Sequence, residues 1–146
     1  MDPKEDVAAA AVREVKEETG IDAEFACIGA VRETHQGPFG TSDLYCVCVL
    51  KLAPHYGEGS LPEPTPEQSE IAAARWLDLE TFLGSKWYAK GLYGEMLRSA
   101  AATAQRVAAG QHDAGLQVSR LPSLGGRVES LYHAGPLPSA KLAAKL

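Results

Sequence analysis

The chain has 146 residues, of which 45% are hydrophobic and 23% are charged, a composition typical of one folded domain and unlike that of a disordered chain. Its 14 basic and 19 acidic side chains give a formal net charge of −5, so it lacks the basic excess of proteins that bind nucleic acid or anionic membrane. No apolar run approaches the roughly 20 residues of a membrane helix, and no secretory signal opens the sequence. We therefore predict a soluble, cytoplasmic domain without nucleic-acid or membrane partners; a targeting segment ahead of Met1 would change the compartment.

The first predicted element is a helix over residues 5–18. Its apolar side chains recur at helical spacing, and Gly20 follows at a position where helices commonly end. Strands are predicted over residues 23–32 and 44–52, on either side of the turn-rich loop 34–43. The second strand has no polar alternation in its first part, which predicts a central strand buried on both faces.

The remaining elements follow a loop over residues 53–68 that is too rich in Pro and Gly for regular structure. In chain order they are a short strand over 71–76, a short helix over 79–83, a long helix over 88–109 that ends at Gly110, and two hairpin-like strands within 115–134. The mixture of helices and strands predicts an α/β or α+β fold.

The three cysteines, Cys27, Cys46 and Cys48, form no CxxC pair and no metal-binding spacing. They are interpreted as reduced, partly buried thiols of an intracellular protein. Cys46 and Cys48 alternate to one face of their strand, where core packing is expected.

The clearest chemical signal is the acidic cluster Glu14, Glu17 and Glu18 in the first helix. Their spacing of i, i+3 and i+4 places the three carboxylates on one helical face, where like charges repel unless something compensates. Hard divalent cations such as Mg²⁺ are suited to this, because they bind oxygen ligands. The alternative is a solvated acidic face paired with Arg13 and Lys16.

The wider pattern around this cluster resembles the Nudix box. The family pattern is G-x5-E-x7-R-E-U-x-E-E-x-G-U, where U is apolar, and the chain carries it from the glutamate onward. The matching positions are Glu5, Arg13, Glu14, Val15, Glu17, Glu18, Gly20 and Ile21.

The resemblance implies an α/β/α sandwich around a mixed sheet, over residues 1–133, followed by a flexible tail over 134–146. It also implies hydrolysis of a nucleoside diphosphate linked to another moiety, with Mg²⁺ (or Mn²⁺) as cofactor. By the family pattern Glu14, Glu17 and Glu18 would bind the metal, and Arg13 would orient the catalytic carboxylate through an ion pair with Glu5. Metal would neutralise the developing charge and activate the attacking water.

Residues 31–52, 67–83 and 130–133 are similar to plant-type ADP-ribose/NADH pyrophosphatases and to the animal antisense fibroblast-growth-factor Nudix protein. This resemblance makes ADP-ribose or NADH the expected substrate. Glu67 and Glu70 lie where the wider family often keeps a further carboxylate, and Glu70 is the one we expect to be catalytic; the alternative is a solvated residue at the start of a strand.

Other side chains have weaker claims to the site. Those on the loop before the second strand could line it or be ordinary turn residues; they are His35, Phe39, Ser42 and Asp43. Trp76 and Trp87 are expected in the core or at its edge, with base stacking as the alternative role for one of them.

The chain departs from the family pattern at its start. The first glycine of the box would fall before Met1, Lys4 stands where many members carry Gly, and no residues remain for the strands that precede the box. We expect a sequence that begins at an internal Met, or a genuine short form, with an exposed sheet edge and uncovered apolar surface. Such a chain would be poorly stable alone or completed by oligomerisation, for example as a homodimer. A catalytically inactive remnant that binds nucleotides or partner proteins is therefore the alternative function.

Overall fold

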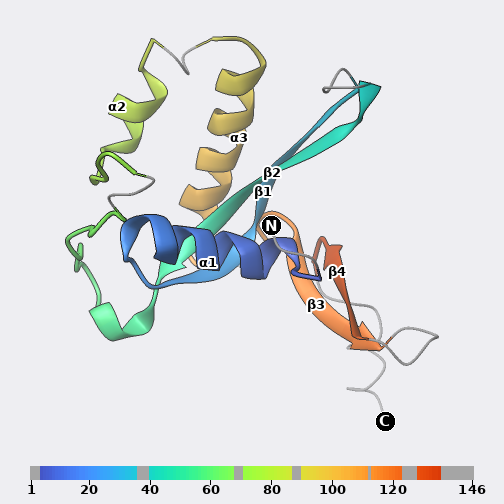
Figure 1. Ribbon diagram of the computed structural model, residues 1–146, viewed down its shortest axis with the longest axis horizontal. Coiled ribbons are helices and arrows are strands. Elements are labelled where there is room, and N and C mark those ends of the chain that lie inside the picture. Colours follow the sequence, from blue (N-terminus) through green and yellow to red (C-terminus); the bar gives the residue numbers. More distant parts are fainter. Residues whose placement is uncertain are drawn as a thin grey trace.

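The computed structural model describes residues 4–35, 40–67, 71–86, 90–111, 113–122 and 128–135. Its longest elements are α1 (Val7–Thr19), β1 (Ala23–Thr34), β2 (Asp43–Leu52) and α3 (Gly91–Ala108). The shorter ones are the 3₁₀ turn η2 (Pro54–Tyr56), α2 (Leu79–Leu83), β3 (Gln117–Pro122) and β4 (Val128–His133). Figure 1 shows their arrangement.

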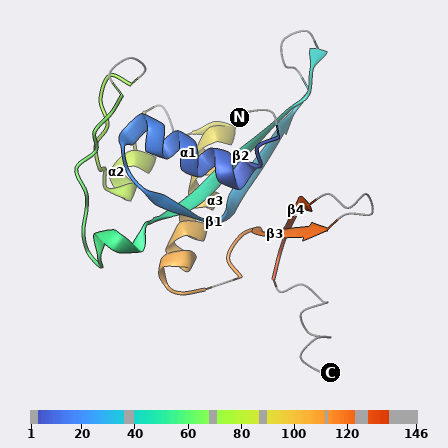
Figure 2. The same cartoon turned by 60° about the horizontal axis from the view of Figure 1, so that its bottom comes forward.

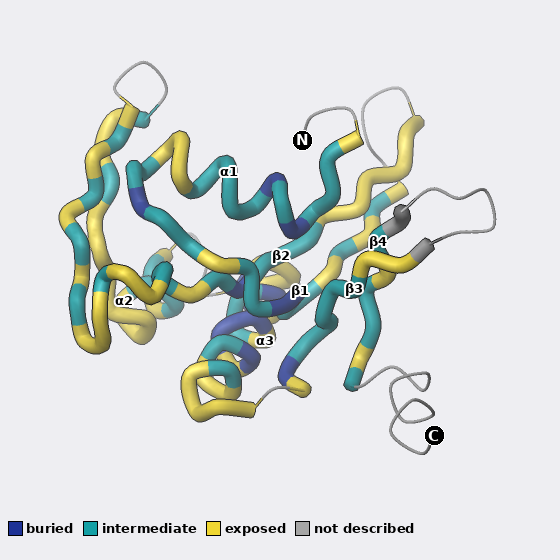
Figure 3. Tube along the Cα trace, turned by 90° about the horizontal axis from the view of Figure 1, so that it is seen from below, coloured by how far each residue is buried: buried dark blue, intermediate teal, exposed yellow. Residues whose placement is uncertain are grey.

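Two helices cover the long hairpin formed by β1 and β2. The strands pair antiparallel from Ala23 opposite Leu52 to Thr34 opposite Asp43, with irregular register between Phe25 and Cys27 and between Ile28 and Ala30. Helix α1 lies on one side of this hairpin and α3 on the other (Figure 3). The predicted α/β class is confirmed, with helices on both faces of the strands.

A second hairpin, β3–β4, is also antiparallel and is joined to β1 by a bridge between Ile28 and Leu116, with hydrogen bonds of 2.9 and 3.0 Å. Figure 2 shows it on the opposite side of the molecule from α2. The pairs among the described strands are all antiparallel, because each strand is joined to its partner as a hairpin and parallel pairing needs a longer crossover.

The core lies on both faces of the β1–β2 hairpin, against α1 on one side and α3 on the other, and is built largely from small side chains. The buried apolar residues are Ala8, Ala10, Ile21, Cys27, Ile28, Val49, Met96, Ala100, Ala101 and Ala114. Close approach depends on Gly29, where an added Cβ would lie 3.1 Å from Ala100 Cα and 3.1 Å from Val49 Cγ2. Burial of small side chains removes little apolar surface from water, so each contributes little to stability.

Several sequence expectations are confirmed. The helix over 79–83 is present, and Asp78 caps its start, since the Asp78 side chain accepts a hydrogen bond from the Thr81 amide. The long helix and the hairpin-like strands are present as well. Within the described residues all three cysteines are free thiols, and burial raises the pKa of each, that of Cys48 to about 11.

The prediction that residues 44–52 are buried on both faces is wrong. Leu44 is 67% exposed and Tyr45 is 51% exposed. In the described part of the chain β2 pairs with β1 alone, and Figure 1 shows the far half of the hairpin extending beyond α1 and α3. The uncovered apolar surface expected from the sequence is found on this half and on the nearby start of α3, where Leu92 is 62% exposed.

The strand predicted over residues 71–76 is also wrong. This segment makes no strand pairing; it lines a pocket with Val15 and Thr19 near the end of α1. The Trp76 indole donates to the carbonyl of Pro62 at 2.8 Å, and 44% of the residue is exposed, so it is not a core aromatic. Residues 71–76 thus contact the end of α1 and the loop that contains Pro62, and they do not pair with another strand. Trp87 lies outside the described residues.

Candidate functional site

Helix α1 has a capping residue at each end. Asp6 is the N-cap, since its Oδ1 accepts a hydrogen bond from the Ala9 amide at 2.8 Å. Gly20 ends the helix with φ 72°, in the left-handed conformation that glycine adopts without strain, and its amide donates to Lys16 O. The helix thus begins at Val7, and Glu5 lies just before it.

Arg13 is the centre of an ion-pair cluster on this helix. Its guanidinium contacts Glu5 through Nε and Nη2, both at 2.9 Å, Glu14 through Nη2 at 2.7 Å, and Glu17 through Nη1 at 2.7 Å. The ion pair expected between Arg13 and Glu5 is therefore present. We define these four residues as the Arg13 cluster.

The cluster runs from a buried end to a solvent-facing end. The Glu5 side chain is 15% exposed, whereas those of Glu14 and Glu17 are 46% and 53% exposed. The pKa of the Arg13 guanidinium is raised above its ordinary value, chiefly by the hydrogen bonds to Glu5 and Glu14, so this side chain is a permanent cation. A fixed cation holds carboxylates together that would otherwise repel one another.

The predicted metal ligands are only partly brought together. Arg13 holds one oxygen of Glu14 and one of Glu17, while the side chain of Glu18 makes no hydrogen bond or ion pair with a described residue. Among the described residues no three acidic, histidine or cysteine side chains converge as a metal-binding group. Glu70 lies outside the described residues, and Glu67 lies exposed on its loop, with its carbonyl accepting from the Ile71 amide.

A groove of about 610 Å³ lies beside the Arg13 cluster, between α1 and the start of β1. Ala8, Val12 and Phe25 give it apolar surface. Its charged side chains are Glu5, Arg13, Lys16, Asp22 and Arg120. Lys16 pairs with Asp22 at 2.8 Å; this contact raises the pKa of Lys16 and lowers that of Asp22. The groove thus offers both an apolar wall and cationic groups.

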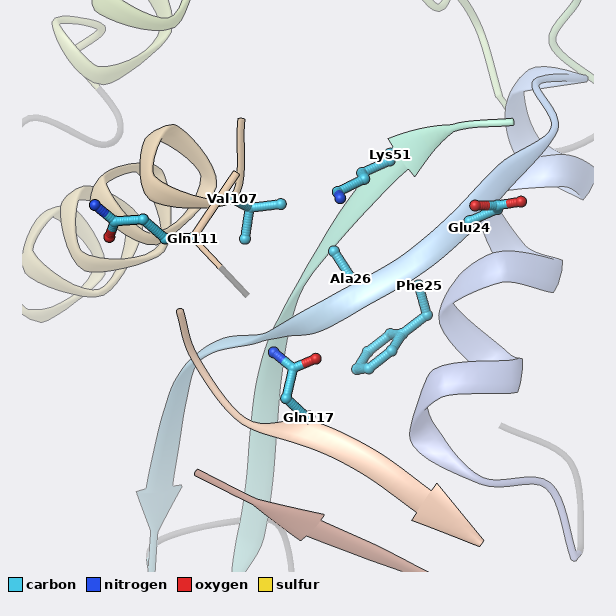
Figure 4. Close-up of a pocket in the computed structure, with 7 residues that line it drawn as sticks. All are labelled: Glu24, Phe25, Ala26, Lys51, Val107, Gln111 and Gln117. Atoms are coloured by element: carbon cyan, nitrogen blue, oxygen red, sulfur yellow. The ribbon is translucent and has the colours of Figure 1, made fainter. Parts of the chain in front are cut away.

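A second pocket, of about 220 Å³, lies at the junction of β1, β2, β3 and α3 (Figure 4). Figure 4 shows Val107 of α3 facing Ala26 and Lys51 of the sheet. Its two amide side chains are already engaged, since Gln111 accepts from Arg106 and Gln117 donates to the carbonyl of Ala114. This pocket contains no part of the Arg13 cluster.

The loop residues singled out from the sequence do not join the Arg13 cluster. His35 Nδ1 lies 3.0 Å from Ser42 Oγ, and Asp43 begins β2 opposite Thr34. These contacts are local to the end of the β1–β2 hairpin and exposed to solvent, as expected for turn residues. Phe39 lies outside the described residues.

A set of contacts that the residue pattern does not predict joins β3–β4 to the start of α1. Asp6 Oδ2 accepts from Arg120 Nη2 at 2.7 Å and from Ser130 Oγ at 2.9 Å, and the Tyr132 hydroxyl accepts from the Ala8 amide at 3.1 Å. Asp6 could have been identified as an N-cap from its residue type ahead of an apolar-periodic run. Its partners, more than 100 positions away, leave no local signal.

Comparison with known proteins identifies the family pattern. The NUDIX domain model matches residues 1–99. The chain is 48% identical over 79 residues to Nudix hydrolase 2 of Arabidopsis thaliana, covering 54% of this chain and 26% of that protein. It is 39% identical over 87 residues to the nucleoside diphosphate-linked moiety X motif 6 protein of Mus musculus, covering 58% of this chain and 26% of that protein.

The aligned part thus spans about a quarter of the length of these relatives. The β3–β4 hairpin lies beyond the residues that match the domain model. No helix in the described part of the chain is long and apolar enough to cross a membrane.

Proposed function

This chain belongs to the Nudix family, and from that premise we propose that it hydrolyses the pyrophosphate bond of nucleoside diphosphate derivatives. The observation that carries the proposal is the Arg13 cluster, in which one guanidinium holds Glu5, Glu14 and Glu17. Hydrolysis of a pyrophosphate needs a positioned base and groups that compensate negative charge. The Arg13 cluster supplies residues for both.

Glu14, Glu17 and Glu18 offer the carboxylate oxygens that a hard divalent cation binds, although the structure does not bring the three side chains together. Glu14 and Glu17 each use one carboxylate oxygen on Arg13, and both side chains are about half exposed to solvent. Together with Glu18 they would hold Mg²⁺ or Mn²⁺ through oxygen ligands. The bound ion would supply charge neutralisation and lower the pKa of a coordinated water.

The residues of the chain have distinct roles in this proposal. Glu5 holds Arg13 with two parallel hydrogen bonds, which fixes the plane of the guanidinium. Arg13 in turn holds Glu14 by Oε1, leaving Oε2 to accept the proton of the attacking water. Glu70 remains a candidate for a second base or ligand.

The neighbouring groove is suited to the rest of the substrate. The ring of Phe25 and the side chains of Ala8 and Val12 offer apolar surface to a base or sugar, and Arg13 and Arg120 offer guanidinium donors to phosphate oxygens. We propose ADP-ribose or NADH as the substrates, as the resemblance of the sequence to plant-type pyrophosphatases implies.

The test is an assay of AMP release from ADP-ribose and from NADH with Mg²⁺, using the wild-type chain and Glu17→Gln. The control is Glu95→Gln on α3, which also disrupts an exposed ion pair with an arginine, Arg98, at 2.6 Å. Catalysis by the Arg13 cluster predicts release by wild type and by Glu95→Gln and a loss of roughly 10- to 100-fold in Glu17→Gln. Release by none of the three proteins would overturn the proposal.

A catalytically inactive module that binds nucleotides or a partner protein is the second candidate function. It is favoured by the exposed apolar residues at the far half of the β1–β2 hairpin, such as Leu44 and Tyr45. A homodimer formed on the same surface is part of this reading. It predicts nucleotide binding in calorimetry without product, or a dimer in light scattering that Leu44→Asp converts to a monomer.

A further inference from the structure

The β3–β4 hairpin holds the start of helix α1 at the point where the Arg13 cluster begins. Asp6, which directly follows Glu5, is bound by Arg120 of β3 at 2.7 Å and by Ser130 of β4 at 2.9 Å. Its other carboxylate oxygen caps the helix by accepting from the Ala9 amide. One carboxylate thus joins both strands of the hairpin to the first turn of α1.

Two further contacts, both made by Tyr132 of β4, fix the orientation of the hairpin relative to α1 and β1. The Tyr132 hydroxyl accepts a hydrogen bond from the Ala8 amide, which is one of the helix-start amides without an intrahelical partner. The Tyr132 ring packs edge-on against Phe25 of β1, with ring centroids 6.4 Å apart and planes at 74°. The hairpin therefore contacts both α1 and β1 through Tyr132.

The same region borders the buried end of the Arg13 cluster. Glu5, Arg13 and Arg120 line one groove, so the hairpin contributes Arg120 to the groove that two members of the Arg13 cluster also line. Glu5 lies outside the hydrogen-bonded turns of α1, which begin at Val7. Its direction toward Arg13 therefore depends on how the chain enters the helix, and Asp6 is the residue at that entry.

We propose that the β3–β4 hairpin, acting through Asp6 and Tyr132, positions Glu5 against Arg13, so that Asp6, Ser130 and Tyr132 are positioning residues for the Arg13 cluster. This inference goes beyond the part of the chain that matches the domain model, which ends at residue 99. Its consequence for catalysis rests on the proposed function, whereas its consequence for the geometry of Arg13 does not.

The chain offers a matched pair of serines for the test. Ser130→Ala removes a hydrogen bond of 2.9 Å from the hairpin to Asp6, and Ser119→Ala removes one of 2.9 Å from the hairpin to its own His133. Both changes remove one hydroxyl from the same hairpin, and only the first touches α1. Tyr132→Phe removes the acceptor of the Ala8 amide and keeps the aromatic ring.

The readout is hydrogen exchange of the Arg13 Nε–H, measured by NMR on the full chain. This proton is bonded to Glu5, and the Nε–H of Arg106, bonded to Gln111 on the far side of the fold, is an internal reference. We expect Ser130→Ala and Tyr132→Phe to raise exchange at Arg13 roughly fivefold, the ratio that one ordinary hydrogen bond supports, with Arg106 unchanged. Ser119→Ala should change neither. Equal exchange at Arg13 in all variants, or a parallel rise at Arg106, would overturn the inference.

The catalytic consequence is tested separately with Glu5→Gln. If the hairpin acts through Glu5, Tyr132→Phe lowers kcat in the wild-type background and has no further effect in the Glu5→Gln background, while the change in Tm is the same in both. Additive losses of kcat would count against positioning through Glu5. A wild-type chain without activity would contradict the proposed function alone, since the exchange result stands independently.

Discussion

Arg13 and Glu5, eight residues apart, are joined by two parallel hydrogen bonds, from Nε to Oε1 and from Nη2 to Oε2, each 2.9 Å long. Glu5 precedes the helix and Arg13 lies near its middle, so this pair closes over almost two turns of α1. The planar fork of arginine is what allows one side chain to hold Glu5 by two atoms and still contact Glu14 and Glu17.

Replacing Arg13 by lysine tests whether this geometry matters. A lysine keeps the charge but offers a single ammonium, which cannot bind Glu5 through two parallel bonds. We expect Arg13→Lys to lower kcat for AMP release and the affinity for Mn²⁺ alone, each by roughly 10- to 100-fold. Arg98→Lys, in the exposed pair with Glu95, is the control and should leave both unchanged. Unchanged Mn²⁺ affinity and kcat in Arg13→Lys would show that charge alone suffices.

Lys4 has a backbone conformation that suits glycine. Its φ of 74° lies in the left-handed region, and among the described residues it is the one non-glycine residue with positive φ. Because a side chain in this region is strained, Lys4→Gly should raise the free energy of unfolding by up to about 1 kcal/mol, after the entropy of glycine is offset.

Urea unfolding measures this effect, with Lys4→Ala as the control. Alanine removes the charge and keeps the Cβ, so it should not stabilise the chain. If Lys4→Ala stabilises as much as Lys4→Gly, the charge of Lys4 and not its backbone conformation is responsible.

Comparing Gly20 with Gly110 tests whether the end of α1 must pack closely against the Thr65 loop. Both follow a helix with positive φ, 72° and 80°, but a Cβ on Gly20 would collide with the Thr65 side chain, whereas one on Gly110 meets nothing within 4 Å. The loop at Thr65 is also hydrogen-bonded to the end of α1, since the Thr65 amide donates to Thr19 O at 2.8 Å. Gly110→Ala should cost about 1 kcal/mol of unfolding free energy, and Gly20→Ala more than about 2 kcal/mol. Equal losses in thermal melts would mean that the Thr65 loop moves aside freely.

Asp6 should make stability depend on acid pH. Its pKa is lowered from 3.8, first by the Ala9 amide and further by Ser130 and Arg120, against the opposing effect of burial. A lowered folded-state pKa means that the contribution is present in full above about pH 3.8 and is lost as the pH falls through the lower folded value. Asp6→Asn should therefore lower Tm at pH 6 and show a shallower loss of Tm between pH 4 and pH 2.

The control for this prediction is Asp113→Asn, on a side chain that is 73% exposed and 3.8 Å from Arg106. It should leave the acid dependence of Tm as in the wild type. If Asp6→Asn retains the wild-type slope, the acid sensitivity of the chain comes from other carboxylates.

The elements predicted from the sequence differ in how well they match the structure. Asp78 caps the start of α2 and Gly20 caps the end of α1, as their residue types indicate, because capping involves atoms only a few positions apart. The predicted strand over residues 71–76 is wrong and the burial of β2 is lower than predicted. A strand exists only if another strand pairs with it, and burial depends on which elements cover it; neither is encoded within the segment.

The sequence by itself determined the acidic pattern of α1, its two ends and the presence of an arginine within reach of Glu5, since helical spacing converts these positions directly into neighbours. The tertiary structure alone decided that Asp6 meets Arg120 and Ser130, 114 and 124 positions away. It also decided that a groove opens between α1 and β1 beside the Arg13 cluster. The physical reason is that helical hydrogen bonds and caps are local, whereas the docking of a hairpin on a helix requires the whole chain to close around a shared core.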